Sequence, residues 1–541
     1  MSIFLSIDGK ESKPVPVSGD IRNAPFPLNI GRNAEIHGQE TAVYICDAII
    51  DQVGVFTKTI SSGLLEKPSQ ELKKQAAMWL DFEEMTVGGE FFSYGIGART
   101  YGAIWPNRHP QPEMWQMKKS AQPVSVKLIS EDKGEIEITN RYLFTNLNEL
   151  NTEWILTGDG ETLETGNLQV NLEAQKSLKV TIPYKKPEIK EGVKYRLLVS
   201  FHQKEKTLWA EPGFEIAWDQ LDLSWFKPVQ EVAKAPSSQL VVKDEKDKIT
   251  ISGNDFIYVF DKKAASISSM QYLGKELIKK GPELNVWRAP LANETDEWAY
   301  WSSNNKHKTE GNGHVAASEW YSAGIDNMQI INELCKVQLI DDQNVTLEVR
   351  NVTILSTKRG AFLNHYLYHI SGDGEIKIDH SVIPNGDMPA WLPRIGVDWI
   401  LDKSLANVQW YGRGSQENYP DRKSGYRTGV YKSTVNDMYE PYLIPQDYGL
   451  RCDNTWVRIT DDKGIGLEFK GNKLFNFSAH PYSEENLTKA LYTYQLHPFD
   501  GVTFNFDYAT SGVGCTALSV FTQYQVMPLR YDFTITVRPV K

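Results

Sequence analysis

The sequence predicts a multidomain, mainly β protein built of antiparallel β-sandwiches. The chain has 541 residues, several times the roughly 150 of one ordinary domain. Apolar and polar residues alternate with period two in many short segments, which is typical of strands that bury one face. Turn sequences separate these segments at short intervals, as in sandwiches, whereas a parallel sheet would show helices between its strands.

Six segments show the clearest alternation and are expected to be strands. They are Val124 to Leu128, Glu135 to Thr139, Leu168 to Leu172, Tyr195 to Phe201, Val337 to Leu339 and Ile376 to Ile378. Tight turns are expected at Asp159–Gly160, Asp373–Gly374 and Asp462–Gly464, because Asp and Gly accept the backbone angles that such turns require. These hairpin-like repeats favour sandwiches.

One helix is expected from about Ser69 to Met78, since Pro68 precedes it and Leu72 and Trp79 fall near one face. Beyond it the strand pattern is broken by a Gly-rich, aromatic stretch.

A second break follows Trp225, where a polar, Pro- and Ser-containing linker lacks periodicity. We therefore expect domain boundaries at both breaks.

Composition and charge narrow the class of protein. Hydrophobic residues make up 41% of the chain, enough to form cores and too much for a disordered polymer. The net charge is −11, so a nucleic acid partner is not expected. The sequence has no run of about eighteen apolar residues, which a membrane-spanning helix would need, so no membrane partner is expected. The non-basic start predicts no signal peptide and hence a cytoplasmic protein, although a parent enzyme with an upstream N-terminus could be exported.

The cysteines and histidines do not predict a metal site or a disulfide framework. The four cysteines, Cys46, Cys335, Cys452 and Cys515, stand far apart without a CxxC pair. His365 and His369 are four apart on an expected strand, about 13 Å from end to end, and cannot share one ion. We interpret both histidines as structural.

The second half of the chain contains a series of Gly, Pro, Arg and aromatic landmarks. They are Leu284 to Leu291, Trp320 to Gly324, Leu392 to Gly396, Trp410 to Arg422, Asp437 to Tyr442, Gly449 to Arg451 and Ser511 to Cys515. In this order they closely resemble the C-terminal small-chain sandwich of family 2 β-galactosidases. The resemblance implies a supersandwich of the galactose mutarotase type.

The resemblance continues upstream and implies a domain order. Phe214 to Gln220 resembles the end of the immunoglobulin-like domain of that family, and Gly102 to Pro112 resembles the last strand of its (β/α)8 barrel. The implied parts are a laminin-G or concanavalin-like fragment (1–83), a terminal barrel strand and helix (84–122), an immunoglobulin-like sandwich (123–225), a linker (226–240) and the small-chain sandwich (241–541).

The resemblance implies a retaining β-galactosidase, or glycosidase, of which this chain is the C-terminal portion. Retaining glycosidases need two carboxyl groups about 5 Å apart, and the family's two glutamates lie on barrel strands before the part that this chain resembles. No catalytic residue is therefore expected here. The family's Mg ligands lie upstream too, and Tyr101 stands where relatives place a sodium-binding Asn, so no metal is expected in this chain.

Candidate site residues follow from the same resemblance. Substrate contacts are expected from Trp105, Asn107 and Arg108 at the barrel rim and from Gly514 and Cys515 in a loop that carries a Trp in many relatives. Glu417 and Asp421 are a carboxylate pair that suggests catalysis, but we prefer to interpret them as part of a charged turn that locks two strands. The expected structural or interface residues are Arg288, Glu417, Asn418, Tyr419, Asp421 and Arg422.

Three hypotheses for function remain. In the first, the chain is inactive alone and binds a complementing large chain or self-associates, with a galactoside carbohydrate as substrate. In the second, it is a non-catalytic carbohydrate-binding or scaffolding protein. In the third, it is a mutarotase-like enzyme, which would require a carboxylate partner for His480 or His497.

Overall fold

The computed structural model describes residues 2–3, 6–7, 10–16, 53–61, 64, 68–80, 103–105, 107–229, 239–291, 294, 316–341, 343–490, 492–514 and 520–541. The chain forms two compact units, residues 1–95 and 96–541. Within the described ranges no helix is long and apolar enough to cross a bilayer.

The first unit contains short paired strands and one short helix. Its strands pair as β1 (Ser2–Ile3) with β4 (Val15–Pro16), β2 (Ser6–Ile7) with β3 (Lys10–Glu11), and β5 (Val53–Val55) with β6 (Met78–Leu80). The helix α1 covers Gln70–Lys74 and is capped by the Ser69 hydroxyl, which accepts the Leu72 N–H. The expected helix is thus too long: Met78 and Trp79 pair with β5 instead, because strand pairing overrides the local helical pattern.

The immunoglobulin-like sandwich packs a four-stranded sheet, ordered β10-β9-β12-β13, on a three-stranded sheet, ordered β11-β8-β7. Its strands are β7 (Val124–Ser130), β8 (Glu135–Asn140), β9 (Leu150–Gly158), β10 (Glu161–Leu168), β11 (Ser177–Thr181), β12 (Tyr195–Gln203) and β13 (Glu215–Asp222). Its core is apolar and includes Val126, Ile138, Trp154 and Leu197. The expected strand from Leu168 to Leu172 is wrong beyond Leu168, where β10 ends, although the residues that follow still fill the core.

The helix α3 (Pro112–Ala121) contacts both sandwiches of the second unit. Pro at its first position suits a helix start. Its Lys119 pairs with Asp219 of β13, and its Glu113 pairs with Arg422 of the C-terminal sandwich. Gly425 lies so close to α3 that an added Cβ would stand 2.7 Å from the Gln116 Cα. The helix α3 is therefore fixed to the C-terminal sandwich.

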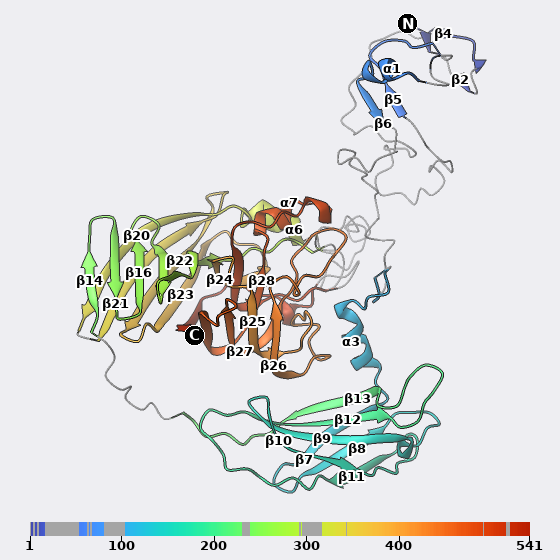
Figure 1. Cartoon of the computed structure of the whole chain (residues 1–541), viewed down its shortest axis with the longest axis vertical. Coiled ribbons are helices and arrows are strands. Elements are labelled where there is room, and N and C mark those ends of the chain that lie inside the picture. The colour runs from blue at the N-terminus through green and yellow to red at the C-terminus, as the bar shows by residue number, and fades with distance from the viewer. Residues whose placement is uncertain are drawn as a thin grey trace. The chain divides into compact units, whose positions relative to one another are not determined.

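The C-terminal sandwich combines a five-stranded sheet with a twelve-stranded sheet (Figure 1). The five-stranded sheet is β14 (Val241–Asp244), β15 (Lys248–Ser252), β16 (Phe256–Asp261), β17 (Ser266–Tyr272) and β18 (Lys275–Glu276). The larger sheet contains β19 (Ile278–Asn285), β20 (Gln329–Ile340), β21 (Asn344–Ile354), β22 (Gly360–Ser371), β23 (Ile376–Gly386), β24 (Arg394–Leu401), β25 (Asn407–Arg413), β26 (Thr428–Thr434), β27 (Arg451–Thr460), β28 (Gly466–His480), β29 (Val502–Thr510) and β30 (Tyr531–Val540).

The strand order of the larger sheet is β19-β24-β29-β28-β30-β23-β22-β21-β20, with β25 joined to β26 and β27, and β27 to β28. Strands β20 to β23 form consecutive hairpins, whereas β30 fills the position between β28 and β23. The order β19-β24-β29-β28 brings side chains from distant parts of the sequence next to one another. This central part of the sheet carries the polar residues described below.

The mainly β prediction is confirmed, and the three expected turns separate neighbouring strands. Asp159 and Gly160 both have positive φ between β9 and β10, as a tight hairpin requires. Two helices of the C-terminal sandwich, α6 (Ala316–Ala323) and α7 (Glu484–Lys489), were not expected. Short helices in a strand-rich sequence have too few turns to show a period.

Candidate functional site

The turn that contains Glu417 to Arg422 is buried and fully engaged. Glu417 is 3% exposed and accepts hydrogen bonds from Arg422 (2.7 Å), from the Tyr442 hydroxyl (2.7 Å) and from the Gly449 N–H (2.7 Å). Burial raises the pKa of Glu417, while the Arg422 guanidinium opposes the rise. Glu417 therefore ties the turn to the segment 442–449.

The neighbouring residues of the turn point to other elements. The Asn418 side chain accepts from the Cys452 N–H at 3.1 Å, and the Tyr419 hydroxyl donates to Asp447 at 2.6 Å. Asp421 accepts the N–H groups of Val513 (3.0 Å) and Gly514 (2.8 Å). Glu417 and Asp421 thus have separate partners, and the turn connects three parts of the sandwich.

Arg413, Arg422 and Lys423 lie close to Glu417 and Asp421 in the sequence, which predicts that they neutralise the two carboxylates, but two of these cations act elsewhere. Arg413 and Lys423 both pair with Asp453, at 2.5 and 2.8 Å. Only Arg422, of the three expected, pairs with Glu417. Sequence proximity suggested the wrong pairs, because β27 brings Asp453 beside the turn from thirty residues away.

The loop Ser511–Gly514 lies against Arg288. The guanidinium of this fully buried residue donates to the carbonyls of Ser511 (3.0 Å) and Gly512 (2.9 Å). Arg288 also pairs with Glu294. Burial raises the pKa of Glu294, and Arg288 opposes that rise. The structure therefore brings Arg288, Asp421 and Gly514 to one loop, whereas Cys515 lies outside the described residues.

Among the described residues just before α3, Trp105 is a buried aromatic residue. Trp105 is 7% exposed; its indole N–H donates to Glu440 at 2.6 Å and its ring packs edge-on against Tyr442. Burial raises the pKa of Glu440 to about 7; the Trp105 hydrogen bond opposes the rise, and the nearby carboxylates support it. Asn107 and Arg108 are exposed, and Arg108 has φ +72°. Their expected substrate contacts stay predictions, and Tyr101 is outside the described residues.

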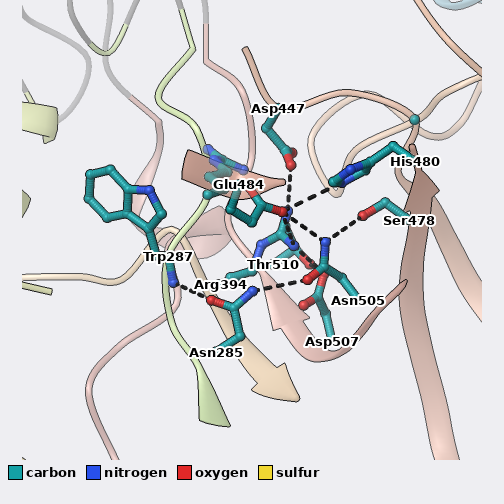
Figure 2. A network of polar contacts seen from close by, with 12 residues as sticks. Asn285, Trp287, Arg394, Asp447, Ser478, His480, Glu484, Asn505, Asp507 and Thr510 are labelled. Atoms are coloured by element: carbon teal, nitrogen blue, oxygen red, sulfur yellow. Dashed lines mark hydrogen bonds and ion pairs between the residues drawn. The ribbon is translucent and has the colours of Figure 1, made fainter. Parts of the chain in front are cut away.

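A deeper polar network lies across the central strands of the larger sheet (Figure 2). Arg394 of β24 is fully buried and donates to Asp447 at 2.5 Å. Its other terminal nitrogen lies 3.9 Å from the carboxylates of both Glu484 and Asp507. Three carboxylates therefore surround one guanidinium.

Amide side chains continue this network. Asn505 of β29 donates to the Ser478 hydroxyl (3.1 Å) and to Glu484 (3.0 Å), and it accepts from Asn285 (3.0 Å). Asn285 in turn accepts the backbone N–H of Trp287 at 2.9 Å. Figure 2 shows these residues converging from β19, β28, β29 and α7. The sheet order, rather than sequence spacing, brings them together.

The carboxylates of the network differ in their protonation. Burial raises the pKa of Asp507 to about 7, with Arg394 opposing and Asp447 supporting the rise. The pKa of Glu484 is lowered despite burial, because His480, Arg394 and Asn505 stabilise its charge. Asp507 therefore takes up a proton at a much higher pH than Glu484, and its protonation relieves repulsion around Arg394.

The histidines considered in the sequence fall in different surroundings. His480 is fully buried and lies 3.5 Å from Glu484, with its Nδ1 3.0 Å from the Tyr482 carbonyl. His497 is exposed. His365 and His369 lie on β22 beside Glu348 (3.1 Å) and Asp379 (3.3 Å), on a strand as expected. The described residues contain no group of three His, Cys, Asp or Glu side chains placed to hold a metal ion.

A cavity of about 450 Å3 lies beside the turn. Its charged side chains include Lys119, which pairs with Asp219, and Arg196, which pairs with Asp222. Two cations, Lys119 and Arg427, already cover the Trp218 ring. Paired charges and a covered ring make this cavity a polar joint between the two sandwiches.

Sequence reasoning missed Asp447, Glu440 and Glu484. Asp447 stands between the landmark segments Asp437 to Tyr442 and Gly449 to Arg451, so its surroundings in the sequence were recognised without its role. The carboxylates described above are held by arginine, lysine, hydroxyl, indole and amide N–H groups. The arrangement can position elements precisely.

Comparison with known families gives two matches. Residues 252–537 match the family model described as "Beta galactosidase small chain", and residues 136–224 match "Beta-galactosidase, domain 4". The first match covers more than half of the chain.

Individual proteins resemble the chain over most of its length. A β-galactosidase of Priestia megaterium is 30% identical over 436 residues, which are 80% of this chain and 39% of that protein. A β-galactosidase of Psychromonas ingrahamii is 27% identical, over 79% of this chain and 41% of that protein. The chain thus spans about 40% of the length of these curated relatives. Among solved structures, a galactose 1-epimerase from Lactobacillus acidophilus aligns with a TM-score of 0.29 and 10% identity, covering 56% of this chain and 98% of that one.

Proposed function

Because this chain belongs to the β-galactosidase small chain family, we propose that it forms the C-terminal portion of a retaining β-galactosidase that hydrolyses terminal β-D-galactosides. In this proposal the two catalytic carboxylates and the Mg ligands belong to a barrel outside residues 1–541, and Tyr101 stands in place of a sodium-binding Asn of the family. The chain alone is inactive. Its partner is a complementing large chain, or further copies of itself.

The observation that carries the proposal is the junction between the segment before α3 and the C-terminal sandwich. Trp105 reaches Glu440, and Glu113 of α3 reaches Arg422, so the segment that resembles the end of a barrel is fixed to the sandwich. The same turn holds the loop Ser511–Gly514 through Asp421. A barrel docked on this segment would therefore meet that loop in a defined position.

Complementation tests the proposal. The purified chain is assayed with a chromogenic aryl β-galactoside, alone and mixed with a fragment of the Priestia megaterium β-galactosidase that lacks the matched region. A chimera in which this chain replaces that region removes the need for tight association. The fragment without this chain is the control.

We expect no hydrolysis by the chain alone, because a glycosidic bond needs a proton donor and a nucleophile at the anomeric carbon. Hydrolysis should appear in the mixture or in the chimera. Activity in neither would contradict the proposal, as would turnover by the chain alone that depends on one of its own carboxylates.

The two alternative functions give different results in the same experiment. A carbohydrate-binding scaffold would bind a galactoside in a calorimetric titration without restoring hydrolysis. A mutarotase-like enzyme would accelerate the change in optical rotation of fresh α-galactose by itself. His480 has a carboxylate neighbour, yet its complete burial leaves a sugar no direct contact with the ring.

A further inference from the structure

The loop Ser511–Gly514 is held by side chains of opposite charge. Arg288 donates to two consecutive carbonyls, those of Ser511 and Gly512, and Asp421 accepts the next two N–H groups, those of Val513 and Gly514. Charge-assisted hydrogen bonds are about twice as strong as neutral ones. The three successive peptide groups between Ser511 and Gly514 are thus fixed in position.

Both glycines of the loop fit this arrangement. A Cβ added at Gly512 would stand 2.4 Å from the Asp421 carboxyl carbon, so the carboxylate packs directly against the backbone. Gly514 has φ +62°, a conformation that side chains rarely adopt. The sequence of the loop therefore allows Asp421 to approach, and it turns the chain at Gly514.

The residue that follows Asp421 holds a different element. Arg422 pairs with Glu113 of α3 at 2.9 Å. The turn itself is tied to the core, because the Tyr419 hydroxyl donates to Asp447 and Asp447 accepts from Arg394. Two adjacent side chains thus connect the loop and α3 to one rigid turn.

We infer that Asp421 is a positioning residue for the proposed β-galactosidase site. Its carboxylate fixes the path of Ser511–Gly514 relative to α3, and so fixes the position of Gly514, which the family resemblance implies as a substrate contact. The backbone part of this inference rests on the contacts above. Its kinetic part rests on the proposed function.

Hydrogen exchange tests the backbone part in the full chain. We compare wild type, Asp421→Ala and Asp421→Asn by mass spectrometry of peptides that contain Val513 and Gly514. These two amides should exchange at least tenfold faster in Asp421→Ala, with partial protection in Asp421→Asn, because the amide oxygen still accepts one N–H. The matched control is Asp341→Ala, which removes a carboxylate that accepts the N–H groups of Gln343 and Asn344.

Steady-state kinetics in the complemented mixture or chimera test the kinetic part. A misplaced loop should raise KM for the aryl galactoside at least fivefold in Asp421→Ala and leave kcat within twofold. A merely structural role would lower the folded fraction and hence the apparent kcat, without changing KM. Asp341→Ala should leave both constants unchanged.

Each outcome decides a part of the inference. Unchanged exchange at Val513 and Gly514 in Asp421→Ala would overturn it, whatever the kinetics show. Faster exchange with an unchanged KM would overturn the role in the reaction. If the wild-type mixture and chimera are both inactive, the proposed function fails, and hydrogen exchange alone decides whether Asp421 fixes the loop.

Discussion

The two sandwiches of the second unit are built on different kinds of core. The core of the immunoglobulin-like sandwich is apolar, and the buried polar residues within its bounds, such as Asn140, Thr152 and Ser200, carry no charge. The C-terminal sandwich buries a larger apolar core together with charged residues, including Arg288, Arg394, Asp447 and Asp507. Two β-sandwiches of the same chain thus differ in whether their cores include buried charged residues.

This difference in core composition indicates that the stability of a domain and the placement of its loops and helices depend on different interactions. Apolar burial is favourable in proportion to area and has no preferred direction. Paired buried charges cost desolvation and add little net stability, but each pair is satisfied in only one geometry. The C-terminal sandwich has its charges where loops and helices must be placed, at the turn, at the loop Ser511–Gly514 and at α7. We interpret them as the means of placing those elements.

The largest expected effect is from Arg394→Met. This change leaves Asp447, Glu484 and Asp507 without their shared cation, and breaking a buried pair costs about 3 to 5 kcal/mol. The measurement is the urea midpoint of the full chain, followed by hydrogen exchange of peptides from β24. Arg530→Met, at a pair exposed by 62% and 58%, is the control and should have little effect. A shift of the urea midpoint no larger than that of the control would contradict the expected difference between buried and exposed charges.

A somewhat smaller effect is expected in the other core. Leu197→Ala, at a fully buried position of β12, should cost about 3 kcal/mol through lost burial and an unfilled cavity. The loss should be the same at pH 5 and pH 8, because no charge is involved. Hydrogen exchange of β12 peptides in urea measures this loss of unfolding free energy, and Leu163→Ala, at an exposed position, is the control. A strongly pH-dependent loss would show that the apolar core is coupled to ionic groups.

The third prediction concerns pH. Asp507 has a folded pKa of about 7, above the unfolded value of about 3.9. Between these values the folded state keeps a proton that the unfolded state releases, so stability falls as the pH rises from 4 to 7. Asp507→Asn removes this dependence, on the order of 2 kcal/mol between pH 5 and 7. Urea midpoints across this range measure it, and a slope as steep as that of wild type would refute the assignment.

The smallest effect is expected at the surface of the immunoglobulin-like sandwich. Lys206 and Glu211 form a pair in which both side chains are more than 70% exposed. Lys206→Ala should change the unfolding free energy by less than about 0.5 kcal/mol, because water screens such pairs. Thermal unfolding of the full chain is sufficient to measure it. A larger change would mean that exposed pairs also matter here.

Much of the fold was predictable because strands leave a local signal. Alternation indicated β8 and β12, and Asp-Gly turns indicated their neighbours. Local pattern failed where tertiary pairing prevailed: Met78 and Trp79 have a helical spacing but pair with β5. After Leu168, the apolar residues Val170 and Leu172 fill the core although they lie outside any strand.

Sequence motifs predicted which residues belong to the site, but they did not predict which residues contact one another there. The residues of the turn and Trp105 were recognised, yet several of their partners lie far away in the sequence. These are Asp447 for Tyr419, Glu440 for Trp105 and Val513 for Asp421. A sequence shows which side chains can pair, whereas the order of strands in the sheet decides which do. Arg413 shows the same limit, since its partner Asp453 arrives on β27.

The position of β30 between β23 and β28 has a consequence for how the sheet assembles. Strands β20 to β23 can pair soon after they are made, because each contacts the next along the chain. The halves that end at β23 and β28 can join only when β30, the last strand in chain order, is available. Until then both edges expose unpaired backbone groups that can recruit another chain. The interval between the synthesis of β29 and that of β30 is therefore the stage at which this sheet is most exposed to aggregation.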